Sequence, residues 1–307
     1  MSTTDLLDPP ARTEAAVVPP IVRARRRRRD PINLGMAVFG ILVFAFLFLP
    51  IVVIVIYSFN TGRLLAAWEG FGFTAYTRAA GNAVIRGSVL TSLEAALGAA
   101  ILSTVLGTLG GLALARAKKK AKWALILTAV LATTLVTPEI VDAISILPWF
   151  VSLGTDFGFA PINNGMVRLV VAHTVMSIAV VTFIVRARMS GADMALEEAA
   201  ADLYATPWNR FRQITLPIAF PGILAGALMS FTLSLDNTIV SSFVQVPGNT
   251  PWPVYIFSAL KVSLRPEIAA VSTIMLLLTL AALAVVALVL RRFGESTEDI
   301  AKTMAGS

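Results

Sequence analysis

The sequence predicts an all-α, polytopic membrane protein with six transmembrane helices, and three observations lead to this prediction. Hydrophobic residues make up 57% of the 307 residues and charged residues only 14%, whereas a soluble domain carries about 25% charged residues. Several apolar runs are long enough to cross a bilayer, and positive charges alternate between the segments that join them. A chain this apolar cannot cover itself with a hydrated surface, which excludes a soluble globular fold.

Six apolar runs have the length of about 20 residues that a helix needs to cross roughly 30 Å of hydrocarbon. Because lipid offers the backbone no hydrogen-bond partner, each crossing is expected to be helical. Two G-x-x-x-G spacings, Gly107 with Gly111 and Gly222 with Gly226, predict close helix packing. The predicted spans are Leu34–Phe59, Val89–Ala115, Trp123–Phe150, Val167–Val185, Ala219–Val246 and Ile268–Leu290.

Positive charges give these spans a direction. The tails and every second connecting segment hold 19 of the 25 Lys and Arg residues, and the other segments hold 6. The positive-inside rule therefore places both termini in the cytoplasm. We expect residues 1–30 to be a disordered basic cytoplasmic tail, 31–293 the six-helix transmembrane domain with a cytoplasmic loop at 190–217, and 294–307 a short cytoplasmic tail.

The composition excludes several kinds of site. The chain has no cysteine, which removes thiolate chemistry, and its single histidine, His173, argues against a histidine-based metal site or catalytic triad. It also lacks the G-x-x-x-x-G-K-[ST] loop that binds nucleotide phosphates. We therefore expect no catalytic residue, metal or cofactor in this chain. The N-terminal arginine cluster is interpreted as a contact with anionic lipid rather than with nucleic acid.

The segment 190–217 is predicted to form two short helices. Ala195 to Leu203 is rich in alanine, the strongest helix former. Thr206 and Pro207 then provide a favoured N-cap and first helical residue. A helix pair this small has no core of its own, so it must pack on its own spans or on a partner protein.

The same segment resembles the EAA motif of ABC-importer permeases, through Glu198-Ala199-Ala200 and the later Leu216-Pro217. The resemblance implies the type I ABC-importer permease architecture, in which this loop docks into a groove of a cytoplasmic ATPase. The residues that it assigns to ATPase coupling are Glu197, Glu198, Ala199, Ala200, Tyr204, Leu216 and Pro217.

The family resemblance also implies partners and a location. It implies a second homologous permease, two ATPase subunits that carry ATP and magnesium, and a periplasmic or lipid-anchored solute-binding protein. It places the chain as a multi-pass protein in the bacterial inner membrane, in contact with lipid and without a nucleic-acid partner.

Three stretches resemble the spermidine/putrescine-type permeases in particular. They are Ser230–Val244, Lys261–Ala270, and Pro138-Glu139 with the nearby Ala143–Ser145. The sequence departs from the family at Tyr204, where glycine usually ends the first short helix. Tyrosine would be strained there, so we expect a different turn or an added ATPase contact. It departs again at Asn237, where polyamine permeases tend to have a second acid.

Acidic residues inside the predicted spans mark a candidate substrate pathway. A charge at the bilayer centre costs at least about 2.5–3.5 kcal/mol, so each requires a reason. Glu139 lies about 24 Å along its helix from the cytoplasmic end, and Asp142 lies one turn further. Pro138 and Pro148 are expected to weaken the helix around these two acids, and discontinuous helices often mark binding sites. Asp236 has a similar depth, so we expect these acids and Asn237 to face one cavity. Glu94 is interpreted as a structural residue.

These observations predict the permease subunit of an ATP-driven importer for a small organic cation, of the polyamine kind. One alternative is ABC import of another small organic solute or ion. Another is a proton-coupled secondary transporter in which the buried acids carry protons, and a third is a membrane scaffold that transports nothing.

Overall fold

The computed structural model describes residues 31–118, 120–193 and 195–292. Within these ranges the regular structure is helical, apart from an isolated bridge between Asn60 and Phe71. The tails predicted at 1–30 and 294–307 lie outside the described residues. The chain divides into two units, 1–50 and 51–307. Helix α1 (Pro31–Tyr57) begins in the first unit and ends in the second.

Five described helices are long and apolar enough to cross a membrane, and they confirm five predicted spans. They are α1, α3 (Ala83–Ala115), α6 (Gly165–Ser190), α9 (Leu216–Asp236, continuous with the preceding short helices from Pro207) and α12 (Pro266–Arg292). The connecting segments form α2 (Thr74–Gly81), η1 (Ala160–Asn163), α7 (Ala195–Asp202), α8 (Pro207–Arg210), the π-helical η2 (Phe211–Thr215), α10 (Ile239–Val244) and α11 (Trp252–Leu260).

The third predicted span is not one helix. It consists of α4 (Lys122–Val136) and α5 (Glu139–Thr155), whose axes differ by 110°. Thr137 and Pro138 between them are extended, with ψ of 130° and 133°. Proline has no N–H to donate and disfavours helical backbone at the residue before it. The third predicted span is therefore broken at Pro138, one of the two prolines expected to weaken it, whereas Pro148 lies inside α5 without ending it.

The fifth predicted span also ends early. Helix α9 stops at Asp236, Asn237 has a ψ of 106°, and α10 then begins at Ile239. The apolar run to Val246 therefore contains a break that hydropathy does not reveal.

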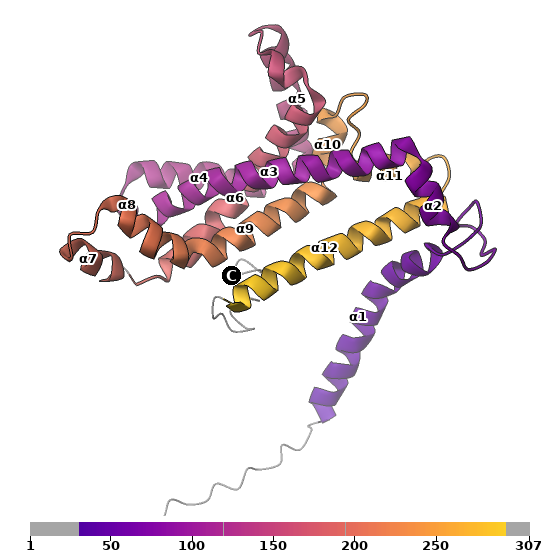
Figure 1. The fold of residues 1–307 in the computed structure, drawn as a ribbon, viewed down its shortest axis with the longest axis horizontal. Helices are drawn as coiled ribbons and strands as arrows, with labels where there is room; N and C mark the ends of the chain where they lie inside the picture. Colours follow the sequence, from indigo (N-terminus) through magenta and orange to yellow (C-terminus); the bar gives the residue numbers. More distant parts are fainter. Residues whose placement is uncertain (1–30, 119, 194, 293–307) are drawn as a thin grey trace, which may run out of the picture. The chain divides into compact units, whose positions relative to one another are not determined.

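Helices α3, α6 and α9 lie side by side and form the core of the second unit (Figure 1). The predicted glycine pairs lie at their contacts. A Cβ on Gly107 would lie 2.7 Å from the Cβ of Val181, and one on Gly226 would lie 3.0 Å from the Cγ1 of the same valine. The hydroxyls of Ser103 on α3 and Ser230 on α9 are 2.6 Å apart. The glycines therefore permit close packing, as predicted.

Candidate functional site

The first candidate region is the loop that contains α7 and α8, near the end of the bundle where α3 stops (Figure 1). The predicted helix start at Thr206 is confirmed, because its Oγ1 accepts the N–H of Asn209 at 3.4 Å and Pro207 follows it. From Pro207 the helical segments α8, η2 and α9 continue without interruption to Asp236. One 30-residue rod therefore joins the loop to the break at Asn237.

Tyr204 ends α7 in the left-handed backbone region, with a φ of 58°. Its N–H donates to the carbonyl of Ala201 at 2.9 Å, and the N–H of Ala205 donates to that of Ala200 at 3.0 Å. This is the hydrogen-bond pattern of a Schellman motif, which usually places glycine at the left-handed position. The turn after α7 therefore keeps the usual Schellman hydrogen bonds, with tyrosine in the position that glycine usually occupies. The tyrosine ring is 96% exposed.

Glu197 ties α7 to two other helices. Its Oε1 accepts hydrogen bonds from the Arg116 guanidinium, just after α3, and from the Thr215 hydroxyl, the latter at 2.6 Å. Arg116 also donates to Thr215 Oγ1 at 2.6 Å. Partial burial raises the pKa of Glu197, but these hydrogen bonds and the charges of Arg116 and Arg210 outweigh it and lower the pKa. The ionised carboxylate of Glu197 therefore holds α7 against Arg116 and Thr215.

The other residues assigned to coupling differ in exposure. Glu198, Ala199 and Pro217 are exposed, whereas Ala200 and Leu216 are half-buried. In the second half of the loop, Thr215 is buried and Trp208 is exposed. The large exposed apolar and aromatic side chains on this loop are those of Leu196, Leu203, Tyr204 and Trp208.

The second candidate region lies where the two helix breaks meet. A cavity of about 160 Å³, here called the polar cavity, is lined by Glu139 and Asp142 from α5 and by Asn237 from the second break. A larger opening of about 990 Å³, here called the open cleft, is lined by Glu139, Asp236 and Asn237, and by residues of α11 and α12. The structure thus brings all four predicted pathway residues to two adjoining cavities, although Asp142 and Asp236 line different ones.

The three acids at these cavities have no partner among the described residues. The carboxylates of Glu139, Asp142 and Asp236 make no hydrogen bond or ion pair with any residue that the structure describes. Glu94, on α3, is exposed and equally unpartnered within the described ranges, and it lines neither the polar cavity nor the open cleft. Unpaired carboxylates in a low-dielectric region favour a cation at that place.

His173 and Asn237 hold the second break together. His173 is 2% exposed, and its Nδ1 and Nε2 lie 2.6 Å and 2.9 Å from the hydroxyls of Ser234 on α9 and Ser241 on α10. The buried Asn237 Oδ1 accepts the N–H of Ser241 at 3.2 Å. These serines were not among the predicted residues, because nothing in their sequence spacing indicates that a histidine on another helix joins them.

Comparisons with known proteins identify the family of the chain. The family model described as "Binding-protein-dependent transport system inner membrane component" matches residues 107–296. The spermidine/putrescine transport system permease protein PotC of Haemophilus influenzae is 35% identical over 254 residues, which cover 83% of this chain and 95% of that protein. The putrescine transport system permease protein PotI of Escherichia coli K12 is 36% identical over 251 residues, 81% of this chain and 86% of the relative.

A solved structure shares the fold. A bacterial ABC transporter involved in the import of the acidic polysaccharide alginate contains a chain that matches with a TM-score of 0.60, over 87% of this chain and 98% of the other. Its sequence identity is 14%, so this likeness concerns the fold alone. The family model covers more than half of the chain, and the relatives match nearly their full length. The chain therefore belongs to the family of binding-protein-dependent transport system inner membrane components, and it is an inner-membrane permease subunit of an ABC importer.

Proposed function

We propose that this permease conducts a small organic cation of the polyamine kind. The observation that carries the proposal is the set of three unpaired carboxylates, Glu139, Asp142 and Asp236, around two helix breaks. Two opposite unit charges 4 Å apart attract by about 4 kcal/mol at an effective dielectric of 20, which is enough to select cations over anions. The names of the relatives in Haemophilus influenzae and Escherichia coli, which refer to spermidine and putrescine, support the same substrate class.

The proposed assembly contains a second homologous permease, two ATPase subunits that bind ATP and magnesium, and a solute-binding protein on the outer side. The loop that contains α7 and α8 would dock on an ATPase through Glu198, Ala199 and the exposed Tyr204. Because the rod from Pro207 to Asp236 is continuous, displacement of this loop would move the Asn237 break at its far end. ATP binding would drive this movement between two conformations of the transporter, because the nucleotide has a higher affinity for one of them.

Uptake measurements test the substrate assignment. We expect the complete transporter in proteoliposomes to import putrescine or spermidine. Asp236→Asn should reduce uptake at low substrate concentration by about tenfold, the effect of losing roughly 1.4 kcal/mol of attraction. Glu94→Gln is the matched control, because it also neutralises an exposed acid within a span but lines neither of the two cavities.

Either of two results would contradict the proposal. One is import of neither cation by the native assembly, and the other is an Asp236→Asn transporter with unchanged rate and affinity.

A further inference from the structure

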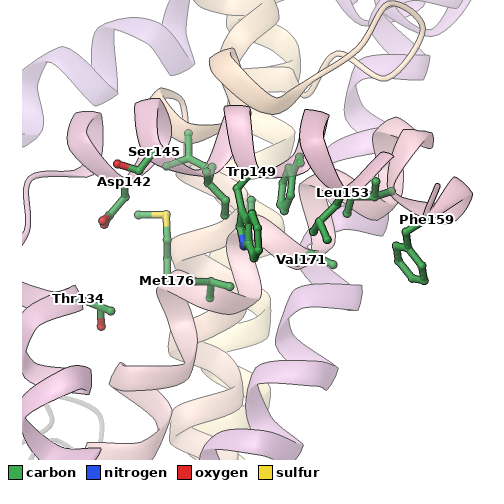
Figure 2. A pocket seen from close by; sticks show the side chains of 14 residues that line it. Thr134, Asp142, Ser145, Trp149, Leu153, Phe159, Val171 and Met176 are labelled. Atoms are coloured by element: carbon green, nitrogen blue, oxygen red, sulfur yellow. The ribbon is translucent and has the colours of Figure 1, made fainter. Parts of the chain in front are cut away.

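A third cavity of about 460 Å³, here called the apolar chamber, lies between α5 and α6. Its volume is within the range of about 300–1,000 Å³ that is typical of small-molecule sites. In Figure 2 Asp142 and Ser145 lie at one end of the row of labelled side chains, Phe159 lies at the other, and Trp149 stands between them. The apolar side chains that line it include Trp149, Phe150, Leu153, Phe159, Val171 and Val175.

The apolar chamber adjoins the proposed substrate pathway. Thr134, Asp142 and Met176 line both this chamber and the polar cavity. Asp142 is the only charged residue that lines the apolar chamber among the residues that the structure describes, and its carboxylate has no partner there. A charge at one end and aromatic and aliphatic groups along the rest give the chamber two chemically distinct parts.

A linear polyamine does not match the whole of this space. Its ammonium groups are separated by short methylene chains, so filling the chamber with it would place a second charge among apolar side chains, at a large desolvation cost. A phospholipid does not match it either, because its phosphate would lie near the Asp142 carboxylate. A ligand that suits both parts has one cationic end and one uncharged apolar body, which can pack against the rings of Trp149 and Phe150.

We infer that the apolar chamber binds the apolar group of a cationic ligand whose amine is held at Asp142, so that the site accepts amines bearing an aromatic or branched alkyl substituent. This inference rests on the proposed function, because the amine uses the carboxylates of the same pathway. It extends that function from linear polyamines to N-substituted ones.

Binding of two probes to the complete permease–ATPase complex in nanodiscs, without the solute-binding protein, tests the inference. The probes are putrescine and N-benzylputrescine, which differ only by the apolar group. We expect N-benzylputrescine to bind at least about tenfold more tightly, because the buried ring leaves water. Val175→Trp fills the chamber from α6 and should reduce this ratio of dissociation constants to about one.

Val151→Trp is the matched control, because Val151 is exposed on α5 to a similar degree and does not line the chamber. This variant should keep the tenfold ratio. A ratio near one in the native complex would overturn the inference, and it is the result expected if lipid or a second permease fills the chamber. A high ratio that Val175→Trp does not change would overturn it as well.

The results also separate this inference from the proposed function. If putrescine is imported but the benzyl group gives no advantage, the inference fails and the polyamine assignment stands. If N-benzylputrescine binds in a manner that depends on Val175 while putrescine is neither bound nor imported, the chamber assignment stands and the polyamine assignment fails.

Discussion

Tyr204 shows how one residue can satisfy the hydrogen bonds of a turn and still strain it. A non-glycine residue in the left-handed region costs about 1–2 kcal/mol, yet the Schellman bonds around Tyr204 are intact. Its ring is exposed and gains nothing from packing within the chain. Strain that persists without internal compensation points to a use outside the chain.

The first prediction concerns this tyrosine. Tyr204→Gly should stabilise the turn by about 1 kcal/mol, seen as slower hydrogen exchange at Ala205 and Leu203, because glycine adopts the same φ without strain. If the ring contacts the ATPase, the same change should weaken ATPase binding in a pull-down. Tyr204→Phe serves as the control, since it keeps the ring and the strain. Undiminished ATPase binding by Tyr204→Gly would show that the ring makes no useful contact.

Glu197 and Glu198 are neighbours in sequence but have different surroundings. Glu198 is exposed, whereas Glu197 is held by Arg116 and Thr215. Because the pKa of Glu197 is lowered, its stabilising contribution is present at neutral pH and is lost only as the pH falls through that lowered value. The motif alone does not distinguish the two acids, since the distinction arises from helices that are distant in sequence.

At the scale of the helices, glycine spacing predicted the packing of α3 against α6 correctly. A second prediction follows from the space at these glycines. A Cβ on Gly111 would lie 2.8 Å from the carbonyl oxygen of Thr182, a backbone atom that cannot move away easily. Gly111→Ala should therefore lower the free energy of unfolding by about 1–3 kcal/mol.

Gly87 lies on the same helix and has nothing within 4 Å of its would-be Cβ, so Gly87→Ala is the matched control. It should be neutral or stabilising by up to about 1 kcal/mol, because alanine favours helix more than glycine does. Thermal unfolding of the purified chain in detergent measures both variants. Equal melting temperatures for the two would contradict the close approach of α3 to α6.

The break between α4 and α5 supports a third prediction. Pro138→Ala restores an N–H and removes the restriction on Thr137, so α4 and α5 can approach one continuous helix and displace Glu139 and Asp142 from the polar cavity. We expect uptake to fall by at least about tenfold while the complex still assembles. Pro148→Ala is the control, since α5 passes through Pro148 without a break. Normal uptake by Pro138→Ala would show that the break is not needed.

For the molecule as a whole, hydropathy predicts the helical fold and the locations of the spans, because crossing lipid imposes the same length and apolarity on every helix. Hydropathy alone does not reveal the breaks, because the apolar runs continue through them; proline marks the break at Pro138 in the sequence, but no such residue marks the one at Asn237. From their depth alone the acids were expected to face one cavity, whereas the structure places them at two adjoining cavities that share Glu139 and Asn237. The partition of Asp142 and Asp236 into separate cavities depends on the 110° bend, which no pattern in the sequence specifies.

A further prediction concerns the energy source. The chain has no phosphate-binding loop, so the purified subunit should neither bind ATP at micromolar concentration nor hydrolyse it. Hydrolysis should appear only when the ATPase subunits are added. Equilibrium binding of labelled ATP and a phosphate-release assay check both statements, with the ATPase subunits alone as the reference. Saturable nucleotide binding by the isolated permease would refute the prediction that ATP binds only to the ATPase subunits.

The continuous helix from Pro207 to Asp236 has a consequence for how such proteins diverge. It is about 45 Å long at 1.5 Å per residue, with the proposed ATPase contacts at one end and the proposed substrate contacts at the other. Substitutions that change the proposed substrate contacts can therefore arise without disturbing the proposed ATPase contacts. The same fold occurs in a transporter of an acidic polysaccharide. A change of cargo would then require substitutions only at the distal end of the rod, about 45 Å from Pro207.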